Sequence, residues 1–141
     1  MSLPKLTAER FEAALKSVGL KYQIDEDGEF VVVFDDVVSW TLISDNLVRM
    51  LAIWRCETIP TAAQAEVMEL LNTINAGMMR PKSYCVVSEE DVTVRFEANL
   101  PNEHGFSDAQ VEAFLHSSFS GIFEVVSKLK EVFPQYVKAG E

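Results

Sequence analysis

Apolar and polar positions along the chain follow two periods, a helical one in three stretches and a strand-like one between them. The helical period predicts three amphipathic helices: Ala8–Val18, Ala62–Ala76 and Asp108–Phe133. A hydroxyl residue that can cap the first amides precedes each of them: Thr7, Thr61 and Ser107. Behind the last two caps, Gln64 and Gln110 stand at the spacing of a capping box, which strengthens the prediction of where these helices begin.

Between the helices, the alternation of side chains and the turn residues predict six strands: Leu20–Ile24, Phe30–Phe34, Val37–Ile43, Leu47–Glu57, Ser83–Ser88 and Val92–Leu100. An Asp-Gly pair at Asp27 and Gly28 predicts a hairpin turn between the first two strands. The run from Phe30 to Phe34 is apolar at every position, which favours a central strand covered on both faces. In the third strand, Val38, Trp40 and Leu42 alternate with Ser39 and Thr41.

The predicted order of elements is α-β-β-β-β-α-β-β-α. Neighbouring strands joined by short turns pair as antiparallel hairpins, so we expect an α+β fold with a curved antiparallel sheet flanked by helices. The length of 141 residues fits one domain, 1–141, with an ordered core of about residues 7–133. We expect the tail beyond Pro134 to be frayed.

The last predicted helix carries an apolar stripe over about half its circumference, which is wider than one core requires. A second copy of the chain would cover the surplus, so we expect a homodimer. The residues predicted to form its interface are Phe119, Ile122, Phe123 and Val126. Small residues at Ala113, Ser117 and Gly121 would let another backbone approach, either within the fold or across the dimer.

Arginine side chains share one face of the strands with aliphatic residues. These candidate partner-binding residues are Arg49, Leu51, Ile53, Arg55 and Arg95. Arginine beside aliphatic side chains is typical of protein-docking surfaces. The alternative is a solvated face along which the arginine stems cover apolar surface.

The net charge of −10 disfavours nucleic acid as a partner, because such a field repels phosphates. No apolar run is long enough to cross a membrane or to act as a signal peptide. The two cysteines, Cys56 and Cys85, lack metal-site spacing and are expected to be reduced and buried. These features together favour a cytoplasmic protein that binds neither nucleic acid nor membrane.

No residue pattern predicts a catalytic centre, a metal site or a bound cofactor. Asp25 and Asp27 resemble part of a calcium loop but lack the positions that would close it. Adjacent strand residues point to opposite faces, so Asp35 and Asp36 are expected to be turn residues. The only histidines, His104 and His116, stand far apart without partnered ligands. We therefore expect a protein that is not an enzyme.

The element order, the Leu71-Asn72-x-x-Asn75 pattern in the second helix and the pattern from Ser83 to Leu100 resemble the YbjN-like family of bacterial proteins. The long last helix beginning near Ser107 matches as well, so that the resemblance covers about residues 7–133. That family is described as a "putative sensory transduction regulator", with a fold similar to type III secretion chaperones. The resemblance implies an α+β fold, a homodimer and protein binding, and it supplies no catalytic residues.

Three functions remain open on the sequence. The first is a non-enzymatic regulatory or chaperone-like module that binds an unidentified protein. The second is a small-molecule sensor with a cavity between the first helix and the sheet, near Phe11, Phe34, Trp40 and Trp54. The third is an enzyme that uses the turn carboxylates Asp35 and Asp36.

Overall fold

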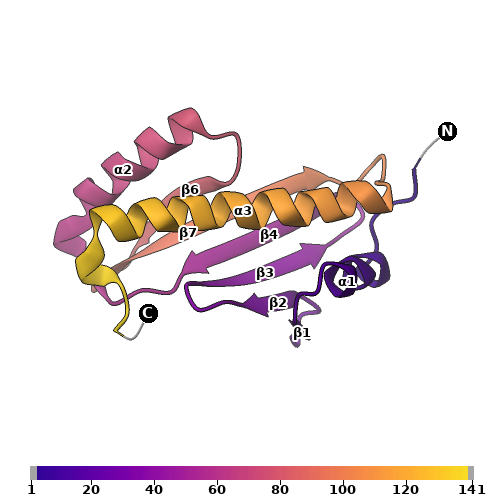
Figure 1. Ribbon diagram of the computed structural model, residues 1–141, viewed down its shortest axis with the longest axis horizontal. Helices are drawn as coiled ribbons and strands as arrows, with labels where there is room; N and C mark the ends of the chain where they lie inside the picture. Colours follow the sequence, from indigo (N-terminus) through magenta and orange to yellow (C-terminus); the bar gives the residue numbers. More distant parts are fainter. Residues whose placement is uncertain (1–2, 140–141) are drawn as a thin grey trace.

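The computed structural model describes residues 3–139, so the ends of the predicted domain, 1–2 and 140–141, lie outside it. Three α-helices lie in the order α1 Ala8–Ser17, α2 Gln64–Gly77 and α3 Asp108–Val132. Two short 3₁₀ turns accompany them, at Thr61–Ala63 and Pro134–Tyr136. The long α3 lies across the strands of a single sheet (Figure 1).

Side chains cap two of the three helices as predicted. The hydroxyl of Thr7 accepts the amide of Arg10, and Ser107 forms the reciprocal capping box with Gln110. The prediction for Thr61 is wrong, because this residue opens the 3₁₀ turn and α2 begins at Gln64 without a side-chain cap. The 3₁₀ turn begins the helical path of the backbone, which a capping side chain would otherwise start.

The sheet is antiparallel at every pairing. Its strands are β1 Gln23–Ile24, β2 Phe30–Val33, β3 Val37–Ile43, β4 Leu47–Trp54, β5 Ile59–Pro60, β6 Lys82–Val87 and β7 Asp91–Pro101. They follow the order β1-β2-β3-β4-β7, with β6 along the other edge of β7 and β5 continuing the line of β4. The α+β fold class is therefore confirmed.

Two strands are each three residues shorter than predicted, and the ends of β2, β6 and β7 differ by one residue. The first strand is only two residues long, and β4 ends at Trp54 although the apolar alternation continues to Cys56. Beyond Trp54 the amide of Arg55 bonds to the carbonyl of Asp36, and the amide of Glu57 bonds to the carbonyl of Tyr136. The first bond extends the pairing with β3 by one position, and the second directs the chain toward the C-terminal turn before the short β5 pairs with β7. The second bond also corrects the predicted frayed tail, because it ties the tail to the sheet at Tyr136.

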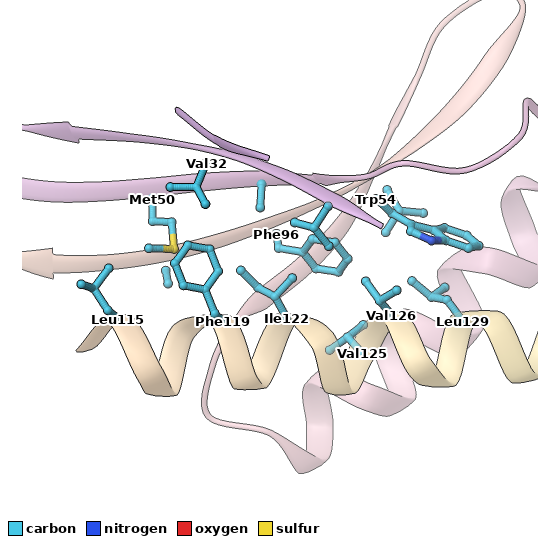
Figure 2. Close-up of a cluster of buried hydrophobic side chains, with 14 of the residues drawn as sticks. Val32, Met50, Trp54, Phe96, Leu115, Phe119, Ile122, Val125, Val126 and Leu129 are labelled. Atoms are coloured by element: carbon cyan, nitrogen blue, oxygen red, sulfur yellow. The ribbon is translucent and has the colours of Figure 1, made fainter. Parts of the chain in front are cut away.

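All three helices cover the same face of the sheet. Figure 2 shows α3 below the strands with α2 on the same side, and α1 reaches this face through the edge-to-face contact of Phe11 with Phe30. Residues of this inner face alternate as fully buried positions along β3, β4 and β7. The prediction that Phe30–Phe34 forms a central strand covered on both faces is wrong: β2 lies beside the edge strand, and Val33 is 60% exposed.

The apolar stripe of α3 is buried within the single chain. Phe119 is 7% exposed, Val126 2% and Ile122 not at all, and Figure 2 shows all three pointing toward the strands. Phe123 is half-buried and packs edge-to-face on Phe34. The four residues predicted as the dimer interface therefore line or flank the chain's own core. Most of the α3 stripe that we expected a second chain to cover is therefore covered by the sheet, α1 and Phe34, whereas Val132 is 51% exposed.

The small residues of α3 also pack within the fold. A Cβ at Gly121 would lie 2.7 Å from the carbonyl oxygen of Arg80, in the loop that follows α2. The guanidinium of Arg80 donates to the hydroxyl of Ser117 one turn earlier. Of the two alternatives for this small-residue edge, Gly121 and Ser117 thus support packing inside the chain, whereas Ala113 is exposed.

A candidate protein-docking face

The face of the sheet that turns away from the helices remains uncovered in the single chain. We call it the outer face. The register of the strands assigns these residues to it: Val31, Val33, Val38, Trp40, Leu42, Leu47, Arg49, Leu51, Ile53, Lys82, Tyr84, Arg95 and Glu97. Every one of them is half-buried or exposed, whereas their neighbours on the inner face are mostly buried.

Strand β3 places its polar side chains on the inner face and its apolar side chains on the outer face. This is the reverse of a strand whose outer face meets only water. It buries the hydroxyls of Ser39 and Thr41, which are 0% and 2% exposed, and turns Val38, Trp40 and Leu42 outward. Antiparallel sheets with one solvated face normally place their polar residues outside. The polarity of β3 therefore marks the outer face as a surface suited to contact with another molecule.

One half of the outer face is aliphatic and aromatic. It comprises the outward residues of β2, β3 and β4, among which Leu42 is 41% exposed and Leu47 39%. In the register of the sheet, Trp40 lies opposite Leu51, and Val38 lies opposite Ile53. Contiguous apolar surface of this kind on a water-facing sheet is typical of an interaction site.

The other half of the outer face is a hydrogen-bonded charge cluster centred on Glu97. Its carboxylate accepts the hydroxyl of Tyr84 at 2.6 Å and the amide of Asn99 at 3.2 Å. Arg49 and Lys82 lie 3.4 and 3.6 Å from it, and the Glu97 side chain is only 11% exposed. The Tyr84 hydrogen bond, followed by Asn99, Lys82 and Arg49, lowers the pKa of Glu97 from 4.5 to about 2. The cluster therefore presents cations to the solvent over a covered carboxylate.

Arg95 lies at the border between the two halves. In the register it stands between Ile53 of β4 and Tyr84 of β6. Its Nε is buried without a hydrogen-bond partner, and its side chain forms no ion pair within residues 3–139. A half-buried guanidinium beside aliphatic surface, without an ion pair in the described part of the chain, is suited to donate through its terminal nitrogens to a carboxylate from outside the chain.

The structure brings four of the five predicted partner-binding residues together on the outer face: Arg49, Leu51, Ile53 and Arg95. Arg55 lies beyond the end of β4, and its guanidinium donates to the carbonyl oxygen of Phe34 at 2.6 Å. This bond holds the end of β2 against β4, so Arg55 has a structural contact that the sequence pattern did not indicate.

The residues proposed for a small-molecule cavity do not line a common space. Phe11 packs on Phe30 beneath α1, Trp40 points to the outer face, and Trp54 is buried at the far end of β4. Of the four, Phe34 borders an apolar pocket of about 160 Å³ between the end of α1 and α3. The cavity as predicted is therefore wrong, and this pocket lies at a different position.

The candidate catalytic groups are dispersed. Asp36 forms an ion pair with Lys130 at 2.7 Å, while Asp35 is exposed, and the two histidines are exposed in separate elements. Both cysteines are free and half-buried, and burial raises the pKa of the Cys56 thiol to about 11. Over residues 3–139, no three histidine, cysteine or acidic side chains are placed to hold a metal ion.

Several residues with structural roles carried no sequence signal. The side chain of Asn102, 1% exposed, bonds to both backbone groups of Leu6 and to the carbonyl of Ser44. Arg10 donates to three backbone carbonyls and to Asp108. Neither belongs to a motif, because their partners are distant in sequence.

One of the two asparagines in the Leu71-Asn72-x-x-Asn75 pattern of α2 has a structural role. The amide of Asn75 bonds to both the N–H and the carbonyl of Ser83, so it occupies the edge of β6 as a neighbouring strand would. Asn72 is exposed on α2.

Comparisons with known proteins agree with this architecture. The fold is similar to that of YbjN from E. coli, itself called a putative transcription regulator, with a TM-score of 0.79 and 16% identity over 97% of this chain and 99% of that one. An uncharacterized protein from Methanothermobacter thermautotrophicus is similar with a TM-score of 0.55 and 14% identity, over 91% and 99% of the two chains. No curated protein matches the sequence. No helix within the described part of the chain is both long and apolar enough to cross a bilayer. The YbjN family, described as "putative bacterial sensory transduction regulator", matches residues 7–130, and the chain belongs to that family.

Proposed function

We propose that this protein is a non-enzymatic, cytoplasmic regulatory module that acts by binding another protein through its outer face. The observation that carries the proposal is the polarity of β3, which buries Ser39 and Thr41 and turns the half-buried Trp40 outward. Apolar surface held against water is unfavourable, and a protein partner removes it from water. The description of the family as a regulator supports the same function.

Site-specific photocrosslinking in cells tests this proposal. A photoreactive amino acid replaces Leu42, which is 41% exposed on the outer face, or Met79, which is 99% exposed in the loop after α2. We expect a discrete protein adduct from position 42 that disappears when Trp40→Glu is added, and none from position 79. Adducts from position 79 alone, or adducts at 42 that persist with Trp40→Glu, would contradict the proposal.

A homodimer is a further part of the proposal. Because Phe119, Ile122 and Val126 are buried within one chain, two copies would meet through other surfaces. Sedimentation equilibrium of the purified protein tests this part. A species of twice the monomer mass supports it, and a monomer at every concentration removes it.

Small-molecule sensing is the second candidate function, and the pocket of about 160 Å³ favours it. The rings of Phe34, Phe119 and Phe123 border this pocket, and Phe34 contacts each of the other two edge-to-face. Apolar cavities of about 150 Å³ are known to bind benzene. A rise in melting temperature with indole, lost in Ser120→Phe at the pocket rim, would support this function, and an unchanged melting temperature would exclude small aromatic ligands.

A further inference from the structure

We infer that the partner segment bound by the outer face is an amphipathic helix with an acidic flank. This inference rests on the proposed function and specifies the chemistry of the partner. Three features of the outer face support it: the layout of the sheet, the sign of the exposed charge and the position of Arg95 between the apolar and charged halves.

The layout of the sheet favours a helix over other shapes. The inner face is covered by helices, and the outward residues of β2, β3 and β4 form a comparable apolar surface. Sheets that are apolar on both faces are typically covered by helices on both. With about 3.3 Å per residue, strands of seven and eight residues are about 25 Å long, a length that a helix of about 16 residues spans.

The exposed charge of the outer face favours an acidic segment. Arg49 and Lys82 are 53% and 65% exposed at their side chains, whereas Glu97 between them is 11% exposed. The face is therefore locally cationic on a chain whose net charge is −10. A second copy that placed its charged half against this one would bring like charges together across the interface, which is unfavourable.

Arg95 provides the point at which the apolar and charged halves meet. Its side chain is half-buried and forms no ion pair within residues 3–139, so its terminal nitrogens can donate to a carboxylate of the partner beside Ile53. A helix that buries apolar side chains over Trp40 and Leu51 would carry its acidic flank along Arg95 and Arg49. Arg95 is thus the specificity-determining contact, and Trp40 is the apolar anchor.

A pair of synthetic helical peptides tests the inference. Both have leucine at helical spacing, and the remaining positions are glutamate in one and lysine in the other. Binding is followed by the fluorescence of Trp40, since Trp54 is 2% exposed and is covered by the core. We expect the glutamate peptide to bind at least about tenfold more tightly than the lysine peptide.

Variants assign the binding to the outer face. Arg95→Glu is expected to weaken the binding of the glutamate peptide at least about tenfold and to remove the preference for it over the lysine peptide. Trp40→Glu, like Trp40→Phe, removes the fluorescence signal. The affinity of Trp40→Glu is therefore measured by calorimetry, and we expect no binding. The exposed cation Lys21, outside the outer face, gives the matched control Lys21→Glu, which is expected to leave the affinity unchanged.

Each alternative outcome overturns a different statement. If the lysine peptide binds as tightly as the glutamate peptide or more tightly, the inference that the partner segment is acidic is wrong. Protein docking on the outer face then still holds. If neither peptide binds, helix docking on this face is wrong. If the protein alone forms a dimer that Trp40→Glu and Arg95→Glu both dissociate, the occupant is a second copy and the inference is overturned.

Discussion

At the scale of single residues, the fold depends on a few polar side chains whose partners are far away in the sequence. Asn102 joins the segment before α1 to the turn between β3 and β4, with three hydrogen bonds of 2.8–2.9 Å. Glu97 organises the charged half of the outer face. Neither residue was singled out from the sequence, because a composition or spacing pattern contains no information on which distant backbone groups a side chain meets.

Replacing Asn102 by alanine is expected to lower the free energy of unfolding by about 2–4 kcal/mol, because buried backbone groups of Leu6 and Ser44 lose their partners. Urea unfolding followed by circular dichroism measures the change. The control is Asn72→Ala on the exposed face of α2, which is expected to change stability by less than about 0.5 kcal/mol. Equal effects of the two substitutions would contradict the role of Asn102.

Glu97 is expected to make stability depend on pH in the acid range. Its pKa is lowered from 4.5 to about 2 in the folded protein, so its ionised form stabilises the fold above the unfolded value. This contribution is fully present above about pH 5 and is lost as the pH falls from there toward 2. Unfolding free energies of the wild type and Glu97→Gln between pH 2 and 7 measure it. The difference between the two proteins should shrink as the pH falls, and a constant difference would show that the pKa of Glu97 is not lowered.

At the scale of elements, periodicity predicted the three helices and most strands, but not the direction in which β3 faces. Alternation shows that Trp40 and Ser39 lie on opposite sides, and it does not show which side is inside. Thr41 is buried because it pairs with Phe30 on one side and Met50 on the other, so these large neighbours determine the inner face. The short β5 was missed because two residues carry no period.

The close approach of α3 to the loop after α2 gives a prediction in which two effects oppose each other. Alanine is favoured over glycine inside a helix by up to about 1 kcal/mol. At Gly121, however, the added Cβ would lie 2.7 Å from the backbone oxygen of Arg80. We expect Gly121→Ala to destabilise the protein by about 1–3 kcal/mol, since overpacking outweighs helix propensity.

Gly77 is the matched control for Gly121 because it lies at the end of α2 with no atom within 4 Å of an added Cβ. Gly77→Ala is expected to be neutral or to stabilise the protein by up to about 1 kcal/mol. Thermal unfolding of the two variants compares them directly. If Gly121→Ala also stabilises the protein, the packing of α3 on the Arg80 loop is incorrect.

At the scale of the whole molecule, the sequence predicted two surfaces for contact with other chains, the apolar stripe of α3 and a face of the strands, and the structure buries most of the first within the single chain. The stripe of α3 is wide because this helix packs under the sheet and also contacts α1 and Phe34. The width of a stripe does not distinguish several neighbours within one chain from a second chain. The candidate residues of β4 and β7 lie on the surface that remains uncovered, since strand alternation placed them together.

A comparison of the melting temperatures of Trp40→Glu and Phe119→Asp tests the central claim most directly. The claim is that the outer face is uncovered in the single chain, whereas the apolar stripe of α3 is buried within it. Trp40 is half-exposed, so its variant is expected to fold with a melting temperature within about 5 °C of the wild type. Phe119 is 7% exposed, and a buried unpaired carboxylate costs several kcal/mol, so that variant should melt more than about 10 °C lower or fail to fold. The opposite order, with Trp40→Glu unfolded and Phe119→Asp unaffected, would contradict the account.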